Sequence, residues 1–275
     1  MSISVLMSVY RAEKAERLDR AMKSIWDDQT LKPSQIILIK DGPLGVGLDA
    51  IIDSWKEKLG PVLCLIHNES NLGLTKSLNK GLKMVESEYV ARMDSDDISH
   101  PNRFKCQLEF LNNHPDIDVV GGWIQEFNDT NQNLGKRCYP ADPDIIKKYI
   151  VRASPLAHPT VMMRNSLFLN GFQYNEDYIT SQDLALWFDL LSHGHKISNI
   201  QEVTLYFRLD DNTVARRSRK KAVGELKIYL HGIRSIYGVF SFYYLYPFMR
   251  FIFRMLPQKL VKCVYKSNIR ETILN

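Results

Sequence analysis

Cysteine is scarce in this chain, and so are long apolar runs. The 275 residues include 4 cysteines, none of them at CxxC spacing or beside a histidine in a metal-binding pattern. This excludes a disulfide framework, argues against a zinc site and predicts reduced thiols. The uncharged stretch 236–249 has only 14 residues, whereas a membrane-spanning helix needs about 20.

The sequence shows no internal repeat and no low-complexity block, and we expect no secretory leader. A strand-like run begins at once, without the basic region, apolar region or cleavage site of a leader, so we expect the body of the protein to stay in the cytoplasm. The composition, 45% hydrophobic, 24% charged and 11% aromatic, excludes a disordered or collagen-like chain. The length fits one large α/β domain or two small domains.

Charge is nearly balanced overall but unevenly distributed. The formal net charge is +5, from 36 basic and 31 acidic residues. Residues 208–275 carry 14 basic and 4 acidic side chains, a net +10, which leaves 22 basic and 27 acidic side chains, a net −5, in residues 1–207. This asymmetry predicts that the C-terminal quarter contacts an anionic partner, either nucleic acid or a membrane surface.

Short apolar runs alternate with helix-like segments at the start of the chain. Apolar runs of this length predict buried strands, and apolar residues at helical spacing predict the helices between them. The expected strands are 3–9, 36–39, 62–66 and 89–93, and the expected helices are 13–28, 48–58 and 74–86. The order predicts an α/β fold with a mostly parallel sheet and helices on both faces.

The middle of the chain is less regular. We expect a helix over 101–112, a strand over 119–127, a polar loop over 128–135, a strand over 158–164, an apolar helix over 181–193, and a last strand ending at Tyr206 and Phe207.

Polar residues follow the predicted strands, at the edge where parallel sheets bind ligands. The strongest feature is the triplet of carboxylates Asp94, Asp96 and Asp97 after the fourth strand. Three carboxylates so close repel each other unless a cation neutralises them, and Mg²⁺ and Mn²⁺ prefer carboxylate and phosphate oxygens. The alternative is a solvated acidic turn in which Asp96 or Asp97 caps the next helix.

Six segments, in order, resemble the motifs of the family 2 glycosyltransferases of bacterial surface-polysaccharide synthesis. They are SVLMSVY, IILIKDG, NLGLTKSLNKGL, EYVARMDSDDISHPNRF, HPTVMMR and SQDLALW. The resemblance implies the GT-A fold, a Rossmann-like mixed sheet with helices on both faces that binds a nucleotide-diphospho-sugar. It divides the chain into a catalytic domain over 1–210, with a nucleotide-binding half (1–100) and an acceptor half (101–210), and a basic amphipathic helical tail over 211–275.

The resemblance also implies a donor site for a UDP-sugar. Tyr10 and Asp41 would hold the uracil or ribose, with Ser8 in the same nucleotide-contacting segment as Tyr10. Lys76 and Arg92 would contact the diphosphate or ribose. Alternatives stay open, because Asp41 also fits an ordinary turn residue and Lys76 a solvated lysine on a helix face.

In the acidic cluster, the resemblance makes Asp96 the principal ligand of a Mn²⁺ or Mg²⁺ ion. Asp94 is then the first acidic residue of an Asp-x-Asp motif and faces the ribose or a metal-bound water, while Asp97 supports the site or acts as a cap. Such a metal neutralises the diphosphate and stabilises the departing UDP.

Transfer with inversion also requires a general base, for which the family uses an acidic residue before an apolar helix. Asp183 is the candidate here, because Gln182 stands where a Glu is usual. The alternative is that Asp183 only caps the helix that follows.

Other residues of the acceptor half have weaker signals. His158 would line the acceptor site or touch the diphosphate, and Trp187 would stack on a sugar face. The alternatives are a buried, hydrogen-bonded histidine and a core tryptophan. We expect Asn79 to support neighbouring loops.

The C-terminal tail combines basic clusters with the uncharged stretch 236–249. We expect an amphipathic helical hairpin that lies in the plane of an anionic membrane surface. A core helix and an interface between copies of the chain are the alternatives.

The resemblance implies an inverting hexosyltransferase that uses a UDP-sugar, of glucose or galactose type, and a polyprenyl-diphosphate-linked saccharide acceptor. We expect it to attach peripherally to the inner face of the cell membrane. Lys40 stands where many family members have an Asp, so the choice of nucleotide stays open. A nucleotidyltransferase is the alternative enzyme, although SVYRAEKAE has no glycine for a phosphate loop. A protein that binds nucleic acid through its tail is the alternative outside enzymes, but we expect no nucleic-acid partner because apolar residues interrupt the basic clusters.

Overall fold

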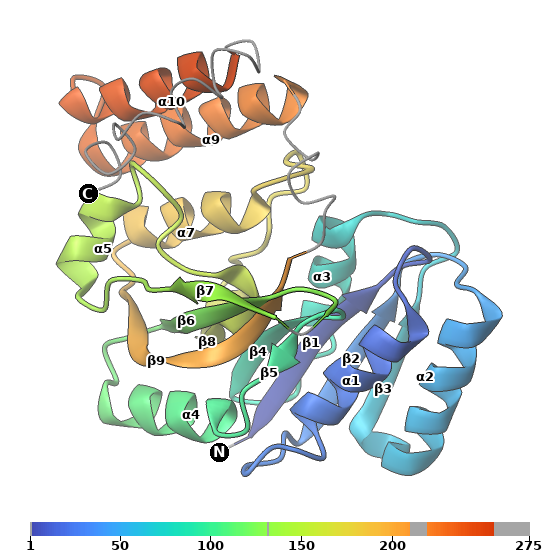
Figure 1. The fold of residues 1–275 in the computed structure, drawn as a ribbon. Helices are drawn as coiled ribbons and strands as arrows, with labels where there is room; N and C mark the ends of the chain where they lie inside the picture. The colour runs from blue at the N-terminus through green and yellow to red at the C-terminus, as the bar shows by residue number, and fades with distance from the viewer. Residues whose placement is uncertain (1, 131, 210–218, 256–275) are drawn as a thin grey trace.

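The computed structural model describes residues 2–130, 132–209 and 219–255, and a mixed sheet forms its centre (Figure 1). The sheet has the strand order β3-β2-β1-β4-β8-β6-β9-β5, and β7 pairs with β6 off this path. The strands are β1 (Ile3–Val9), β2 (Gln35–Lys40), β3 (Leu63–His67), β4 (Tyr89–Asp94), β5 (Ile98–Ser99), β6 (Val119–Phe127), β7 (Asn133–Arg137), β8 (Met162–Arg164) and β9 (Ile197–Arg208).

Helices cover both faces of this sheet. The α-helices are α1 (Ala15–Ile25), α2 (Val46–Leu59), α3 (Leu74–Leu82), α4 (Arg103–Asn113), α5 (Pro143–Tyr149), α6 (Ser166–Leu169), α7 (Gln182–Ser192), α9 (Arg219–Tyr237) and α10 (Leu245–Met255). The described residues also form the 3-10 turns η1 (Gly60–Val62), η2 (His158–Thr160) and η3 (Phe242–Tyr244). The expected α/β architecture with helices on both faces is confirmed.

The parallel half of the sheet follows the sequence prediction closely. Strands β3, β2, β1 and β4 pair in parallel, and each lies within one residue of its predicted bounds. Strands β1, β2 and β4 are buried almost continuously. This is the burial expected of parallel strands that are covered on both faces, and it explains why apolar runs predicted them.

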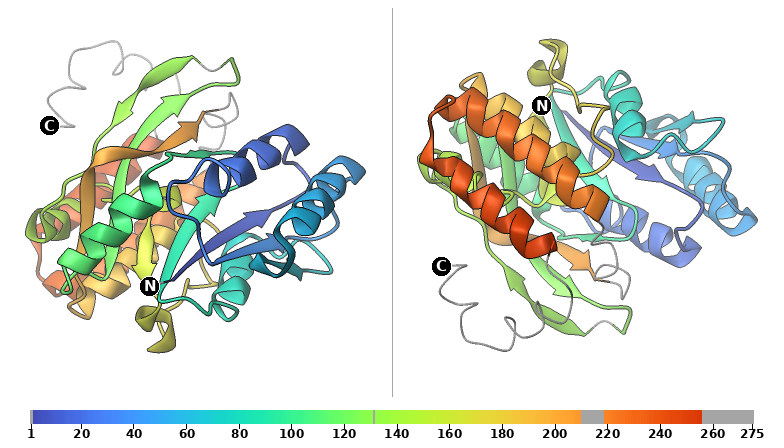
Figure 2. Two further views of the ribbon diagram at one scale, coloured as in Figure 1. Left: turned by 90° about the horizontal axis from the view of Figure 1, so that it is seen from below. Right: turned by 90° about the horizontal axis from the view of Figure 1, so that it is seen from above.

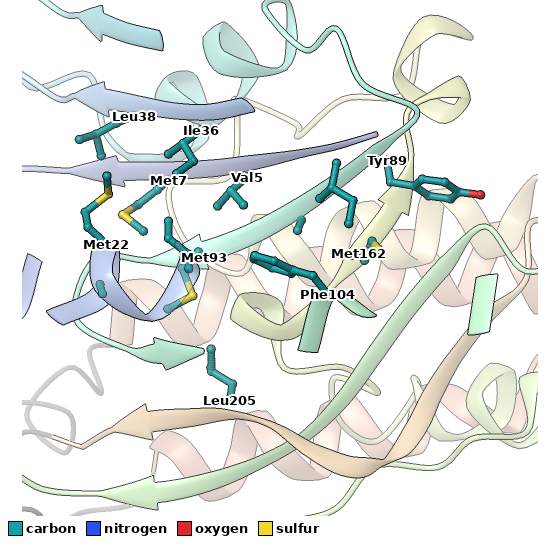
Figure 3. Close-up of a cluster of buried hydrophobic side chains, with 14 of the residues drawn as sticks. Val5, Met7, Met22, Ile36, Leu38, Tyr89, Met93, Phe104, Met162 and Leu205 are labelled. Atoms are coloured by element: carbon teal, nitrogen blue, oxygen red, sulfur yellow. The ribbon is translucent and has the colours of Figure 1, made fainter. Parts of the chain in front are cut away.

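Alternate side chains of the parallel strands form a hydrophobic cluster on one face of the sheet. Figure 3 shows Val5 and Met7 of β1, Leu38 of β2 and Met93 of β4 in this cluster. Met22 of α1 packs against them, and side chains of α2 and α4 complete the cluster.

The intervening side chains of the same strands face a second cluster, built with α3, α7 and α9. Leu6 of β1 and Val90 of β4 belong to it. Since side chains alternate along a strand, Ser8, Arg92 and Asp94 project on this second face. The carboxyl ends of β1 and β4 therefore direct polar groups towards the half of the chain that contains α7.

The second half of the chain departs from the prediction at several points. The segment 158–164 is not one strand: it begins with the 3-10 turn η2, with Pro159 in its first turn, and only Met162–Arg164 form β8. Proline has no N–H to give to a sheet ladder. The predicted loop 128–135 includes the start of β7, which forms a hairpin with β6.

Helix α5 was not predicted, although the sequence signals its start. The side chain of Asp142 accepts hydrogen bonds from the N–H groups of Asp144 and Ile145, both at 2.9 Å, and Pro143 opens the helix. An aspartate N-cap followed by proline is a recognised start signal. Its short apolar pattern, with only Ile146 buried, left too little periodicity to detect.

The described part of the tail, residues 219–255, contains two helices that lie side by side at the top of Figure 1 and in the right view of Figure 2. Helix α9 packs on α7, and its Ile228, Tyr229 and Ile233 are buried. Helix α10 lies on α9. None of the helices within the described ranges is long and apolar enough to cross a membrane. The remaining basic clusters of the tail, at 216–218 and 259–270, lie outside the described residues.

Gly232 allows the close approach of α9 to α7, and its replacement should destabilise the fold. A Cβ atom at this position would lie 2.1 Å from a ring carbon of the buried Phe188. We expect Gly232→Ala to lower the free energy of unfolding by about 1–3 kcal/mol, the usual cost of overpacking. Urea denaturation followed by circular dichroism measures this change.

Gly224, on the same helix, provides the matched control. A Cβ there would have no neighbour within 4 Å. Gly224→Ala should therefore raise the free energy of unfolding by up to about 1 kcal/mol through helix propensity alone. Equal effects of the two substitutions would contradict the packing of α9 on α7.

Candidate active site

The polar residues predicted to follow the parallel strands do gather at one edge of the sheet. Ser8 of β1 is in register with Asp94 of β4. The N–H of Asp41, just after β2, donates to the carbonyl of Val9 at 2.8 Å. Tyr10 follows β1 and is 45% exposed, so its ring is free to stack on a flat ligand.

The three carboxylates of the acidic cluster converge. One ligand oxygen from each of Asp94, Asp96 and Asp97 lies within 4.8 Å of the others. Asp94 ends β4, and the other two lie in the turn before β5. Glu13 adds a fourth carboxylate nearby, and its Oε2 accepts a hydrogen bond of 2.9 Å from Ser95.

Burial and mutual repulsion make this cluster costly to ionise without a cation. Burial, together with the charges of Asp94 and Glu13, raises the pKa of Asp96 to about 7. The pKa of Asp97 also lies well above its ordinary value, because it is buried beside Asp94 and Asp96. Its Oδ2 is buried and has no hydrogen-bond partner among the described residues. An unpartnered carboxylate oxygen within an all-oxygen donor set fits Mg²⁺ or Mn²⁺.

We expect Mn²⁺ to stabilise the protein against thermal unfolding, and to do so more strongly at about pH 8 than at about pH 6. A proton on Asp96, whose pKa is about 7, competes with the cation at the lower pH. The melting temperature with Mn²⁺ or with EDTA, measured at both pH values, tests this expectation.

The cation-free protein should show the opposite trend. A carboxyl whose pKa is higher in the folded than in the unfolded state stabilises the fold at low pH, and this contribution is lost as the pH rises through the folded value. Asp96 therefore lowers the stability of the cation-free protein as the pH rises from 3.8, the ordinary pKa of this side chain, to about 7, its pKa in the folded protein. An identical Mn²⁺-induced shift at both pH values would contradict a cation on Asp96.

Arg208, which the sequence analysis missed, holds the acidic turn in place. Its backbone N–H donates to Oδ1 of Asp97 at 2.8 Å, and its Nε donates to the carbonyl of Asp96 at 2.9 Å. Its Nη1 donates to Asp129 at 2.8 Å, and Asp129 also pairs with Arg17. Arg208 directly follows Phe207, so the rule that selected polar residues after strands also applied to it.

Arg208→Ala is expected to weaken Mn²⁺ binding by roughly 10–100-fold, the usual effect of losing a residue that orients metal ligands. Because Asp129 already neutralises the guanidinium, loss of positioning should outweigh loss of a positive charge. Arg137→Ala is the matched control, since Arg137 pairs with Glu126 on the exposed β6–β7 hairpin. Titration calorimetry with Mn²⁺ measures both affinities, and equal values for the two variants would contradict the positioning role.

Arg92 places a buried positive charge beside the cluster. It is 2% exposed, and its Nη2 donates to Asp94. Burial works against its charge, but Asp94 and, less strongly, Asp97 outweigh burial and raise the pKa of the guanidinium. Its Nε and Nη1 have no hydrogen-bond partner among the described residues. These two donors are available to a phosphate oxygen, which guanidinium groups bind well.

Asp41 is committed to the loop that follows β3. It is 4% exposed, and both of its oxygens accept hydrogen bonds: from Asn68 at 3.0 Å, from the N–H of Leu72 at 2.8 Å and from the N–H of Gly73 at 3.0 Å. Asp41 therefore fixes the start of α3, on which Lys76 is exposed.

Asp183 lies in the first turn of α7, and Ser181 is the N-cap residue. Ser181 adopts a left-handed conformation, with φ 61°, which no other described non-glycine residue shares. Burial raises the pKa of Asp183, while the N–H of Leu184 and the charge of Arg92 oppose that rise. Asp183 thus belongs to the same electrostatic environment as Arg92 and Asp94, although it comes from the other half of the chain.

His158 and Trp187 are buried beneath this site. Nε2 of His158 lies 2.8 Å from the hydroxyl of Tyr174, and burial and Arg92 hold the pKa of His158 well below its ordinary value, so the ring is neutral. Trp187 is fully buried. The prediction that it stacks on a sugar is therefore wrong in this conformation, because its ring faces are covered by the core. Gln182 beside Asp183 is also buried.

Asn79 supports a neighbouring loop, as predicted. Its side chain donates to the carbonyl of Tyr174 at 2.8 Å and accepts from the N–H of Tyr174 at 3.0 Å. These two hydrogen bonds connect α3, in the nucleotide-binding half, to Tyr174, whose hydroxyl group is the hydrogen-bond partner of His158.

Comparison with known proteins identifies a family for this arrangement. The family model described as Glycosyl transferase family 2 matches residues 4–172. Over 269 residues the chain is 32% identical to the UDP-Gal:alpha-D-GlcNAc-diphosphoundecaprenol beta-1,3-galactosyltransferase of Escherichia coli, covering 98% of this chain and 96% of that protein. It is 30% identical over 266 residues to the amylovoran biosynthesis glycosyltransferase AmsE of Erwinia amylovora, covering 96% and 98% of the two chains.

The fold also has a solved counterpart. The crystal structure of S. aureus TarS 1–349 in complex with UDP-GlcNAc matches with a TM-score of 0.63 at 17% identity, covering 94% of this chain and 82% of that one. At this identity the likeness speaks for the fold alone.

Proposed function

Since the chain belongs to glycosyl transferase family 2 and is a glycosyltransferase with a GT-A-like fold, we propose that it transfers a hexose, with inversion, from a UDP-sugar to a lipid-linked oligosaccharide. The observation that carries this proposal is the convergence of Arg92, the acidic cluster and Asp183 at one edge of the sheet. The name of the E. coli relative supports galactose as the hexose and a polyprenyl diphosphate as the lipid carrier.

The donor would lie along the carboxyl ends of β1, β2 and β4. Tyr10 would stack on the uracil, and Ser8 and Asp41 would border the ribose. Asp96 and Asp94 would hold Mn²⁺ or Mg²⁺, which when bound neutralises the diphosphate. The two unpartnered donors of Arg92 support a contact with a phosphate oxygen of the same diphosphate, and the exposed Lys76 would add a further positive charge.

Asp183 would act as the general base. As the acceptor hydroxyl oxygen forms its bond to the anomeric carbon, the bond from that carbon to the oxygen of UDP breaks, and the hydroxyl proton moves to Asp183. Burial makes this carboxylate more basic than usual, which suits proton abstraction near neutral pH. Gln182 and the neutral His158 would shape the acceptor side.

The acceptor would be a saccharide on a polyprenyl diphosphate, and the enzyme would attach peripherally to the inner face of the membrane that holds it. The proposal is tested with purified protein, Mn²⁺, a synthetic diphosphate-linked saccharide acceptor and a panel of nucleotide sugars. We expect UDP release with UDP-galactose or UDP-glucose, and a β-linked product by NMR. Release of GDP alone, or an α-linked product, would contradict the proposed donor or stereochemistry.

A further inference from the structure

Helix α10 turns its apolar face away from the protein. Its exposed side chains recur at helical spacing, and the loop and the 3-10 turn η3 before it add three more exposed apolar residues. The members of this apolar face, with their exposed fractions, are Val239 60%, Phe240 100%, Phe242 99%, Leu245 62%, Phe248 45%, Met249 52%, Ile252 61% and Met255 36%. An ordinary surface helix buries such a stripe against the core.

The two arginines of α10 pair with α9 instead. Arg250 pairs with Glu225 of α9 at 2.9 Å, and Arg254 pairs with the same carboxylate. Arg250 also donates to the carbonyl of Arg152 at 3.1 Å. These contacts fix the rotation of α10 about its axis, so exposure of the apolar face is built into the packing of the two helices.

We infer that this apolar face seats the protein on the surface of an anionic bilayer, with α10 lying in the membrane plane. Charge argues for a bilayer as the occupant, because residues 208–275 carry a net +10 and anionic lipids attract basic segments that flank an inserted apolar face. Because none of the described helices is long and apolar enough to cross a membrane, we expect insertion to the depth of the headgroups.

Seating by this face would bring the bilayer to the acceptor half of the protein. Helix α9 lies between α10 and α7, and the first turn of α7 holds Asp183. The inference rests on the proposed function in one respect: an enzyme whose acceptor is lipid-linked must reach a substrate held in a membrane. Lipid binding is measured without any sugar transfer, so the two proposals fail separately.

The test is cosedimentation of the full chain with phosphatidylcholine vesicles that contain or lack phosphatidylglycerol, across a salt series. We expect binding to the anionic vesicles that weakens with salt, and a loss of roughly tenfold or more in the partition coefficient for Phe240→Ser with Phe242→Ser, and for Ile252→Ser. Leu169→Ser is the matched control, because Leu169 on α6 is also an exposed apolar residue, at 78%.

Three readouts distinguish the bilayer from other occupants. The variants should keep the wild-type melting temperature and the wild-type rate with an acceptor on a short, water-soluble chain. In Phe240→Trp, fluorescence should shift to the blue on adding anionic vesicles. Vesicle binding that the variants leave intact overturns the inference, as does salt-sensitive binding to DNA without vesicle binding. A lipid-free dimer that the same variants dissociate would assign the face to a second copy of the chain and overturn it equally.

Discussion

Asp96→Asn should abolish nearly all transfer, lowering kcat/KM by about 10³-fold. A divalent cation supplies several kcal/mol of charge stabilisation to a departing oxyanion, and each 1.4 kcal/mol or so changes the rate by a factor of ten. The substitution keeps the shape of the side chain but removes a charged ligand. It should also relieve the repulsion that raises the pKa of Asp97, so the variant should fold at least as stably as the wild type without added cation.

Two measurements make this expectation specific to a metal site. Titration calorimetry should show loss of Mn²⁺ binding in Asp96→Asn, and Asp94→Asn should weaken binding less, because Asp94 is already paired with Arg92. Asp116→Asn is the control, since Asp116 forms an exposed pair with Lys196 outside the site. If the wild-type enzyme transferred sugar as fast in EDTA as in Mn²⁺, the acidic cluster would not act through a cation.

Asp183→Asn should lower kcat by about 10²–10⁴-fold, the usual contribution of a general base, with little change in donor affinity. The acid limb of the wild-type pH profile should lie above the ordinary range of a carboxyl group, because burial raises the pKa of Asp183. Since a base must be deprotonated to act, kcat should rise with pH through that value, and this limb should disappear in the variant.

Asp189→Asn is the matched control on the same helix. Asp189 is half exposed and lies within 3.4 Å of His193 on the outer side of α7. If Asp183 only stabilised the first turn of α7, both substitutions would lower the free energy of unfolding by similar amounts. Neither substitution would then change kcat by more than a few-fold. A pH profile that is the same in wild type and Asp183→Asn would exclude the base role.

The parallel half of the fold was predictable because its signals are local. Strands β1, β2 and β4 are buried on both faces, so apolar runs mark them, and the polar residue after each run lies at the ligand-binding edge by the geometry of parallel sheets. The convergence of Asp41 and Asp94 followed from that rule alone. The family match removes the nucleotidyltransferase alternative, which the missing glycine-rich loop already disfavoured.

What could not be predicted depends on contacts between distant segments. Arg208 reaches Asp97 because β9 pairs with β5, and no local pattern specifies that pairing. The orientation of α10 about its axis depends on Glu225, the only acidic residue within the described range 219–255. A tryptophan in an apolar helix such as Trp187 can be either a core residue or a residue that stacks on a sugar. Only the position of Trp187 in the second hydrophobic cluster decides between these alternatives.

The contact of Gly232 with Phe188 determines where this enzyme can be truncated and where chimaeras with its relatives can be joined. The family resemblance places the boundary of the catalytic domain near residue 210, but a fragment ending there would leave Phe188 and its neighbours on α7 without the cover that Ile228 and Ile233 provide. The left-handed Gly238, which ends α9 with φ 79°, is a better point of division. Chimaeras that exchange the segment proposed to bind the membrane should keep α9 with the catalytic portion and replace only the residues after Gly238.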